Sequence, residues 1–484
     1  MLFNSLDYFI FLPVVFTVFW LLGRGRSKIQ NGILLIASYV FYGWWDYRFL
    51  SLIILSTLVD YVVGKAIHAT SEQKIKTRWL WVSIVFNIGL LGFFKYFDFF
   101  VDSFVNAFSF AGVTIENVWT LNIILPVGIS FYTFQTLSYS LDVYRGKLRP
   151  TDDLLAFATY VGFFPQLVAG PIERASNLLP QIEGVKRFKY EQAVEGLKLM
   201  LWGFFKKVAI ADTLALMVDD IFANYATYPS TTLILGTIFF GFQIYCDFSG
   251  YSDIAIGTAK LFGVELMSNF KFPYFSRSIA EFWRRWHISL STWFRDYLYI
   301  PMGGSRASRP LAIRNIFVIF LVSGFWHGAN WTFVVWGLYH ALLFLPLFHF
   351  NANRNYLEAP NIFSSGKTFV VEGTQILVTF LLVMVGWVFF RSGTLTDAMV
   401  YLQRMFFGFT HWEYHHPLGY RMVDFFALLA FFLIYEYRIR KDERNPFKFK
   451  SKYVRFAMYT LVVFLLLLFY DDTMNNRTFV YFQF

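Results

Sequence analysis

Residues 315–353 contain no Asp, Glu, Lys or Arg and are rich in Phe, Val, Leu and Trp. The roughly 30 Å hydrocarbon core of a bilayer is crossed by a helix of about 20 predominantly apolar residues. The uncharged stretch therefore predicts two consecutive membrane-spanning helices, over 315–330 and 331–350.

A histidine, His327, lies inside this stretch, in the segment SGFWHG at 323–328. A charged side chain at the bilayer centre costs roughly 2.5–3.5 kcal/mol. A neutral imidazole costs less, and the neutral form is the one that accepts a proton. His327 is therefore a candidate catalytic base within the membrane. The alternative is a histidine that only hydrogen-bonds a neighbouring helix.

The whole chain has the composition of an integral membrane protein. Apolar residues make up 57% and charged residues 15%, against about 25% charged in soluble domains. Cys246 is the single cysteine, which excludes an internal disulfide. We expect an all-α polytopic protein with one domain over 1–484 and ten to thirteen membrane elements. The candidate spans are 8–22, 31–47, 49–67, 79–97, 119–141, 231–250, 315–330, 331–350, 368–390, 420–437 and 454–470.

The net charge of +10 lies largely in loops between these spans. Basic loops face the cytoplasm and anionic lipid, so the charge does not indicate nucleic acid as a partner. The loop 438–455 is strongly basic, whereas 98–118 is acidic. This alternation predicts a multi-pass membrane protein with its basic loops in the cytoplasm and both termini outside it.

The middle of the chain predicts irregular membrane elements. Pro165, Gly170 and Pro171 interrupt the apolar segment 154–171, and Lys206 and Lys207 lie in another. Non-helical backbone at membrane depth is tolerated where protein buries it or water reaches it. The pattern therefore favours a central cavity over a simple bundle of straight helices.

The basic region 271–314 precedes the uncharged stretch and is predicted to face the cytoplasm. It contains a Gly-Gly turn that is suited to form an anion-binding nest. A large anionic donor, such as a thioester of coenzyme A, could bind here and extend toward His327; a loop that touches lipid head groups is the alternative. The candidate donor-binding residues are Arg284, Arg285, Gly303, Gly304 and Arg306.

Other polar residues receive structural interpretations. Asp247 and Asp253 are expected to pair with nearby arginines, because unpaired carboxylates near a membrane are costly. His340 is expected to pack. The segment HWEYHH at 411–416 differs from the H-E-x-x-H order of zinc proteases, so we expect no metal site.

Four segments together resemble the membrane-bound O-acyltransferase superfamily, and within it the bacterial branch that O-acetylates alginate. They are FPQLVAGPI at 164–172, QIYCDFSGY at 243–251, FWRRWHISL at 282–290 and GFWHG at 324–328. The resemblance is strongest over about 160–345. It implies a ring of helices around a tunnel, His327 as the active-site histidine, and His287 as a second polar residue near the tunnel.

The resemblance also implies acetyl-CoA as the donor substrate, with no permanently bound cofactor. The acetyl group would pass to an extracytoplasmic polysaccharide through an esterase-like partner protein. Tyr481, in the aromatic C-terminus, is a candidate acyl relay because a phenol ester has a good leaving group. D-alanyl transfer to teichoic acid from a carrier protein, a non-catalytic transporter and a scaffold remain alternatives, and the acceptor polymer stays open.

Overall fold

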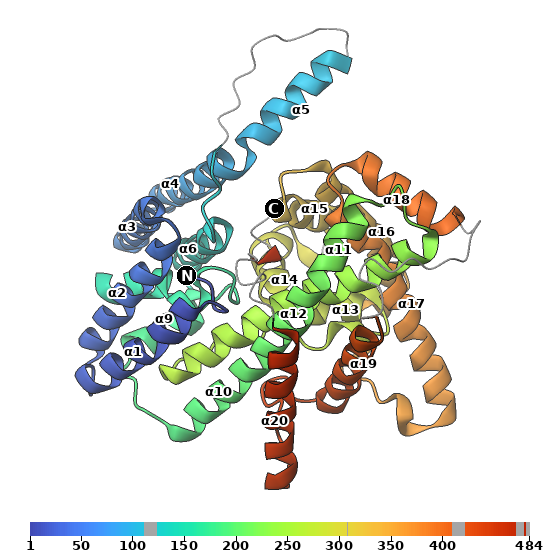
Figure 1. The fold of residues 1–484 in the computed structure, drawn as a ribbon. Coiled ribbons are helices and arrows are strands. Elements are labelled where there is room, and N and C mark those ends of the chain that lie inside the picture. The colour runs from blue at the N-terminus through green and yellow to red at the C-terminus, as the bar shows by residue number, and fades with distance from the viewer. Residues whose placement is uncertain (111–122, 307, 409–421, 471–478, 481–484) are drawn as a thin grey trace. The chain divides into compact units, whose positions relative to one another are not determined.

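The computed structural model describes residues 1–110, 123–306, 308–408, 422–470 and 479–480, and these residues form helices and no strand (Figure 1). Seven helical segments in them are long and apolar enough to cross a membrane. The predicted all-α membrane protein is confirmed; the tunnel stays a prediction. The seven segments are Ser27–Ala69, Gln73–Ser109, Ser230–Leu261, Arg309–His327, Trp331–His349, Gly366–Arg391 and Lys452–Phe469.

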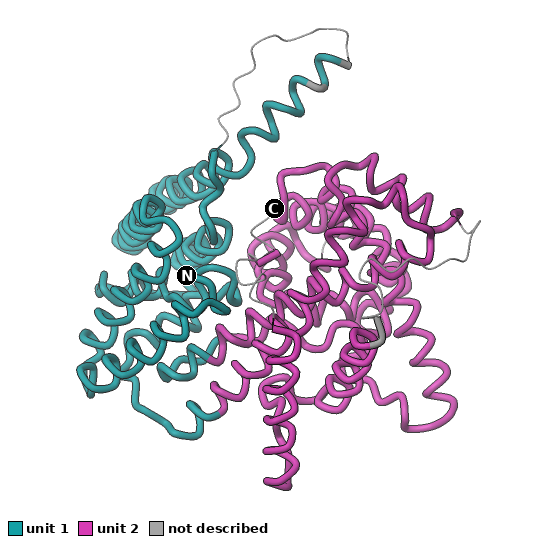
Figure 2. Tube along the Cα trace, viewed as in Figure 1, with its two compact units in different colours: residues 1–194, 258–266 teal, residues 195–257, 267–484 magenta. Residues whose placement is uncertain are grey.

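The chain divides into two compact units, one with residues 1–194 and 258–266 and the other with residues 195–257 and 267–484 (Figure 2). Unit 1 contains a buried polar cluster. The Asp60 carboxylate accepts hydrogen bonds from Ser83 Oγ (2.5 Å), Ser140 Oγ (2.6 Å) and Asn87 Nδ2 (2.7 Å). These bonds join three helices and satisfy a carboxylate that is fully buried. The helices of unit 1 are α1 (Leu6–Leu22), α2 (Ser27–Asp46), α3 (Leu50–Ala69), α4 (Gln73–Leu91), α5 (Phe97–Phe110), α6 (Ile129–Tyr144), α7 (Leu154–Gly162), α8 (Phe164–Leu167), α9 (Ala175–Glu183) and the start of α10 (Tyr190–Phe204).

The predicted interruption in 154–171 is present in unit 1. Helix α7 ends at Gly162, and Phe163 has non-helical backbone angles before the four-residue helix α8. Pro165 lies in the first turn of α8, where the missing N–H of a proline costs no helical hydrogen bond. The apolar segment is therefore two short buried pieces and not one span.

Unit 2 is built on α12 and on the hairpin of α15 and α16. A Cβ atom on Gly324 would collide with the main-chain carbonyl of Phe333, and one on Gly337 with that of Phe320. The two backbones therefore approach more closely than any larger residue would permit. The helices of unit 2, after the end of α10, are α11 (Thr213–Ala223), α12 (Ser230–Leu261, as far as Gly257), α13 (Ile279–Arg285), α14 (Ile288–Phe294), α15 (Arg309–His327), α16 (Trp331–His349), α17 (Gly366–Arg391), α18 (Leu395–Phe407), α19 (Met422–Ile439) and α20 (Lys452–Phe469).

A second close approach joins α10 to α12. A Cβ atom on Gly250 would lie 2.8 Å from the carbonyl oxygen of Gly203 and 3.0 Å from the amide nitrogen of Lys207. Helix α10 continues directly into η3 (Phe205–Asp212), a stretch of π-helix. Such widened turns are frequent at functional sites. This one carries two consecutive buried lysines, Lys206 and Lys207.

Candidate functional site

His287 and His327 lie side by side in unit 2. Their ring centroids are 6.2 Å apart, with 54° between the ring planes. The two side chains are 0% and 3% exposed. The sequence analysis singled out both residues, and the fold brings them together although they are forty positions apart in the chain.

The end of α15 positions His327, which is its last residue. The chain turns at once into α16, whose first turn is capped by the Asn330 side chain. Asn330 Nδ2 also donates to the Gly393 carbonyl (2.8 Å), which ties the turn to the end of α17. The His327 ring packs edge-on against Trp336 (5.2 Å) and Phe390 (5.4 Å). The imidazole is therefore held in an aromatic surrounding.

Asn269 fixes the tautomer of His287. Its Oδ1 atom accepts from the Ser289 amide (3.3 Å) and the Ser289 hydroxyl (2.9 Å), and lies 3.1 Å from His287 Nδ1. Because a main-chain amide can only donate, this side-chain atom is an acceptor, and His287 Nδ1 must carry the proton. In the neutral ring the proton-accepting lone pair is therefore on Nε2. Asn269 Nδ2 in turn lies 3.2 Å from Ser252 Oγ on α12.

The backbone and the burial of His287 support this state. Its φ of +43° is in the left-handed region, where few non-glycine residues lie and which often marks functional positions. Burial lowers the pKa of His287 to about 3. The ring is therefore uncharged at neutral pH and is in the form that a general base requires.

Helix α13, which leads to His287, is held by buried ion pairs. The Glu281 carboxylate lies 3.0 Å from Arg277 and 2.7 Å from Arg285. The Ser278 hydroxyl caps the first turn of the helix. This arrangement places Arg284 and Arg285 at the end of α13, directly before Trp286 and His287.

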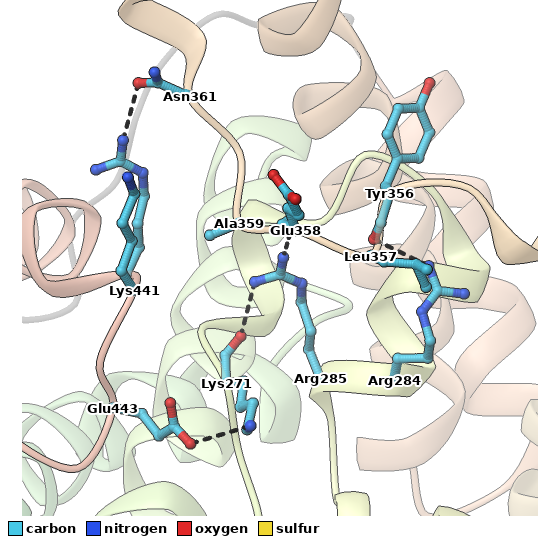
Figure 3. Close-up of a pocket in the computed structure, with 11 residues that line it drawn as sticks. Lys271, Arg284, Arg285, Tyr356, Leu357, Glu358, Ala359, Asn361, Lys441 and Glu443 are labelled. Carbon is cyan, nitrogen blue, oxygen red and sulfur yellow. Dashed lines mark hydrogen bonds and ion pairs between the residues drawn. The ribbon is translucent and has the colours of Figure 1, made fainter.

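Arg284 and Arg285 line a cavity of about 710 Å³ (Figure 3). Five cationic side chains face two carboxylates there. Both guanidinium groups are occupied by main-chain carbonyls: Arg284 donates to those of Asn353, Asn355 and Tyr356, and Arg285 to those of Lys271 and Glu358. The arginines therefore shape the cavity wall as well as charging it. The lining residues are Lys271, Arg284, Arg285, Tyr356, Leu357, Glu358, Ala359, Asn361, Arg440, Lys441 and Glu443.

The other three candidate donor-binding residues do not line this cavity. Gly303 and Gly304 both have positive φ, +98° and +54°, and the Arg306 amide donates to the Gly303 carbonyl (3.2 Å). The expected tight turn is therefore present. Its role in binding an anion stays a prediction.

Residues 148–368 match the model of the membrane-bound O-acyltransferase family. The chain is 41% identical over 412 residues to a probable alginate O-acetylase of Pseudomonas aeruginosa, covering 85% of this chain and 75% of that protein. It is 36% identical over 442 residues to a peptidoglycan O-acetyltransferase of Helicobacter pylori (84% and 80%), and 29% identical over 285 residues to a teichoic acid D-alanyltransferase of Bacillus subtilis (56% and 70%). The chain belongs to the membrane-bound O-acyltransferase family. It is an O-acyltransferase, and the matched region contains both buried histidines.

The two aspartates on α12 of this acyltransferase are paired, as expected. Their contacts at ion-pair distance are lysines, whereas Arg444 interacts with the charge of Asp253. Lys207 Nζ lies 2.6 Å from Asp247 and 2.7 Å from Asp212. Lys206 Nζ lies 2.6 Å from Asp253. The π-helical turn η3 presents both consecutive lysines to α12, a geometry that apolar periodicity does not reveal.

His340 packs as expected. Its ring lies 5.0 Å from that of Trp336 and 5.1 Å from that of Trp283. The segment 411–416 and Tyr481 lie outside the described residues. Within the described part of the acyltransferase, no group of three or more His, Cys, Asp or Glu could hold a metal ion.

Sequence reasoning missed Asn269 as a residue of the site. It lies in MSNF at 267–270, a segment without an apolar period that would mark it. The Lys207–Asp247 pair did leave a signal, because opposite charges in two apolar segments of a membrane protein are costly unless they meet.

Proposed function

We propose that this membrane O-acyltransferase takes an acetyl group from acetyl-CoA on the cytoplasmic side and delivers it for O-acetylation of an extracytoplasmic polysaccharide. The single observation that carries the proposal is the buried histidine pair, in which Asn269 leaves Nε2 of His287 as the proton acceptor. We place the protein in the bacterial inner membrane, with both termini outside the cytoplasm.

The relatives support acetyl as the transferred group. Those with the higher identity bear the names alginate O-acetylase and peptidoglycan O-acetyltransferase, at 41% and 36% identity. The D-alanyltransferase is less similar and covers 56% of the chain. We therefore favour acetyl over D-alanyl transfer, with alginate or another cell-surface glycan as the acceptor and an esterase-like protein outside the cytoplasm as the partner.

The basic cavity supports a phosphate-bearing donor. Coenzyme A carries several negative charges on its phosphates, and the cavity offers Lys271 and Lys441 besides its arginines. Charge-assisted hydrogen bonds to phosphate are among the stronger polar contacts in proteins. Because Arg285 is two residues from His287, a donor bound here can extend its thioester toward the histidine pair. Lipid phosphates are the competing occupants.

The proposed reaction is acyl transfer with a histidine as general base. The neutral His327 imidazole accepts the proton of the acceptor hydroxyl while the oxygen attacks the thioester carbonyl. The C–O bond forms, the C–S bond breaks, and the leaving thiolate takes the proton back from the imidazolium. Such a base contributes typically 10²–10⁴-fold. His287 supports the site as a second uncharged proton acceptor beside the first.

Replacement of His327 tests the assignment. His327→Ala should abolish release of free coenzyme A from acetyl-CoA in the presence of acceptor, while the protein still inserts in the membrane. His349→Ala is the matched control, because this histidine is exposed at the end of α16. Acetyl transfer by His327→Ala at the parental rate would overturn the assignment, and a scaffold or transporter would then be the better interpretation.

We further propose Tyr481 as the acyl relay to the external partner. The phenol would receive the acetyl group as an ester and pass it on, with the phenolate as leaving group. Tyr481→Phe keeps the ring and removes the nucleophile. It should block acetylation of the polymer, and the parental C-terminal peptide should gain one acetyl group during turnover. Full polymer acetylation by Tyr481→Phe would exclude the relay.

A further inference from the structure

The C-terminal segment Phe479–Val480 contacts a buried charge of unit 2. The Val480 main-chain N–H donates to Asp247 Oδ2 at 2.7 Å, and the bond is buried. The other oxygen of the same carboxylate, Oδ1, faces Lys207 Nζ at 2.6 Å. Asp247 is 1% exposed. One carboxylate therefore joins a π-helical turn, helix α12 and the end of the chain.

The charges explain why this carboxylate needs a main-chain donor. Lys207 is shared between Asp247 and Asp212, and Lys207 faces only one of the two oxygens of Asp247 at ion-pair distance. A buried carboxylate is stabilised by further hydrogen-bond donors to its other oxygen. The Val480 amide supplies such a donor to the oxygen that Lys207 does not face.

The aromatic contacts connect this anchor to the histidine pair. The Phe479 ring lies 5.4 Å from that of Phe248 and 5.2 Å from that of Tyr251. Phe248 in turn meets the His287 ring edge-on at 4.6 Å. Phe248 directly follows Asp247 on α12. The anchored segment therefore supports, through one aromatic ring, the side chain that Asn269 orients from another direction.

We propose that Asp247 is the docking residue for the C-terminal segment of this same chain, and that the docked Phe479–Val480 positions His287 for acyl transfer. Its effect on catalysis rests on the proposed function; the docking itself does not. Asp247 and Val480 are thus positioning residues, which act through Phe248 and not by contact with the reacting atoms. No metal or added ligand is required.

Thiol labelling tests the docking without any activity. In a Cys246→Ser background, Val480→Cys introduces a single thiol at a buried position. The substitution keeps the main-chain N–H of residue 480. We expect a maleimide to label this thiol at least tenfold faster when Asp247→Ala is added. Equal labelling rates in the two proteins would overturn the docking. Monodisperse elution in detergent confirms that each variant is folded.

Acyl transfer tests the positioning. Val480→Pro removes the N–H donor without touching the buried charges, and Val480→Ala is the matched control that keeps it. We expect Val480→Pro to lower kcat at least tenfold with little change in KM for acetyl-CoA, and Val480→Ala to stay within twofold of the parent. A parental kcat in Val480→Pro would overturn the proposal. This test does not depend on Asp247→Ala, so it decides the question even if that variant fails to fold.

Two further results separate the possible failures. In an Asp247→Ala background, Val480→Pro should have no additional effect, because the hydrogen bond from the Val480 N–H to Asp247 is already lost. Additive losses of kcat would contradict the shared role. If the parental protein transfers no acetyl group at all, the proposed function is wrong, and the labelling experiment still decides whether the segment docks.

Discussion

Replacing Asn269 with alanine should slow acyl transfer by disturbing the tautomer of His287. Asn269 Oδ1 accepts from His287 Nδ1 and from both donors of Ser289. Loss of the acceptor costs the required tautomer about 1–2 kcal/mol, the scale of one buried hydrogen bond. That is about a 5- to 30-fold change in population. We therefore expect Asn269→Ala to lower kcat about 5- to 30-fold.

The assay is turnover of labelled acetyl-CoA by purified protein in proteoliposomes, with thermal unfolding in detergent as the check on folding. Ser252→Ala is the matched control, because it removes only the partner of Asn269 Nδ2, one step further from the ring. We expect it to stay within about threefold of the parent, since a net hydrogen bond contributes about 0.5–1.5 kcal/mol and this one does not touch the imidazole.

Asn269→Asp distinguishes the effect of the His287 tautomer from the effect of a charge beside His287. It keeps the acceptor oxygen but adds a negative charge beside His287, which favours the protonated ring and so raises the pKa of His287 from about 3 toward ordinary values. Its kcat should therefore fall as the pH is lowered toward 6, a loss that Asn269→Ala lacks. A folded Asn269→Ala protein with parental kcat would refute the reasoning.

Three further predictions follow from the packing, a buried lysine and the basic cavity. Gly324→Val should lower the midpoint of thermal unfolding by several degrees because its side chain collides with the facing helix, whereas Gly373→Val, which meets nothing within 4 Å, should not; equal midpoints would show that the hairpin can separate. Burial lowers the pKa of Lys186 to about 8, so the unfolded chain binds more protons between about pH 8 and 10.5. Stability should therefore rise with pH across that window, and in Lys186→Met this contribution should be absent when denaturant midpoints are compared. Lys441→Glu should raise KM for acetyl-CoA at least fivefold with kcat nearly unchanged. An unaltered KM in steady-state kinetics would show that the cavity does not bind the donor.

Several membrane helices could be predicted because length and apolarity determine them, but the expected span 119–141 was wrong in its first part, since the helix there, α6, begins only at Ile129. The expected span 49–67 is α3, Leu50–Ala69. The expected span 231–250 was too short, since α12 continues to Leu261. Asp253 lies beyond the expected end, and Lys206 pairs with it and lowers the cost of its burial. An ion pair between distant segments is not visible in a local window.

The site was predictable where one residue type carries the chemistry. His327 stood out as an ionisable group in an uncharged stretch, His287 was indicated by the family resemblance, and the fold places the two together. Asn269 did not, because a neutral amide has no signature outside the fold. Arg284 and Arg285 were recognised as cationic, but their bonds to main-chain carbonyls depend on the course of a loop seventy residues away.

That loop has an unusual relation to its own sequence. Between Asn353 and Pro360, several of its main-chain carbonyl groups accept hydrogen bonds from guanidinium groups that lie on other elements. The donors are Arg277, Arg284, Arg285 and Arg440. The path of the loop is therefore fixed by hydrogen bonds to its main chain, which do not depend on the identity of its side chains. Side chains such as Leu357 and Ala359 can change during evolution without moving the rim of the cavity, so related enzymes could vary what the rim presents to a donor while they keep its outline.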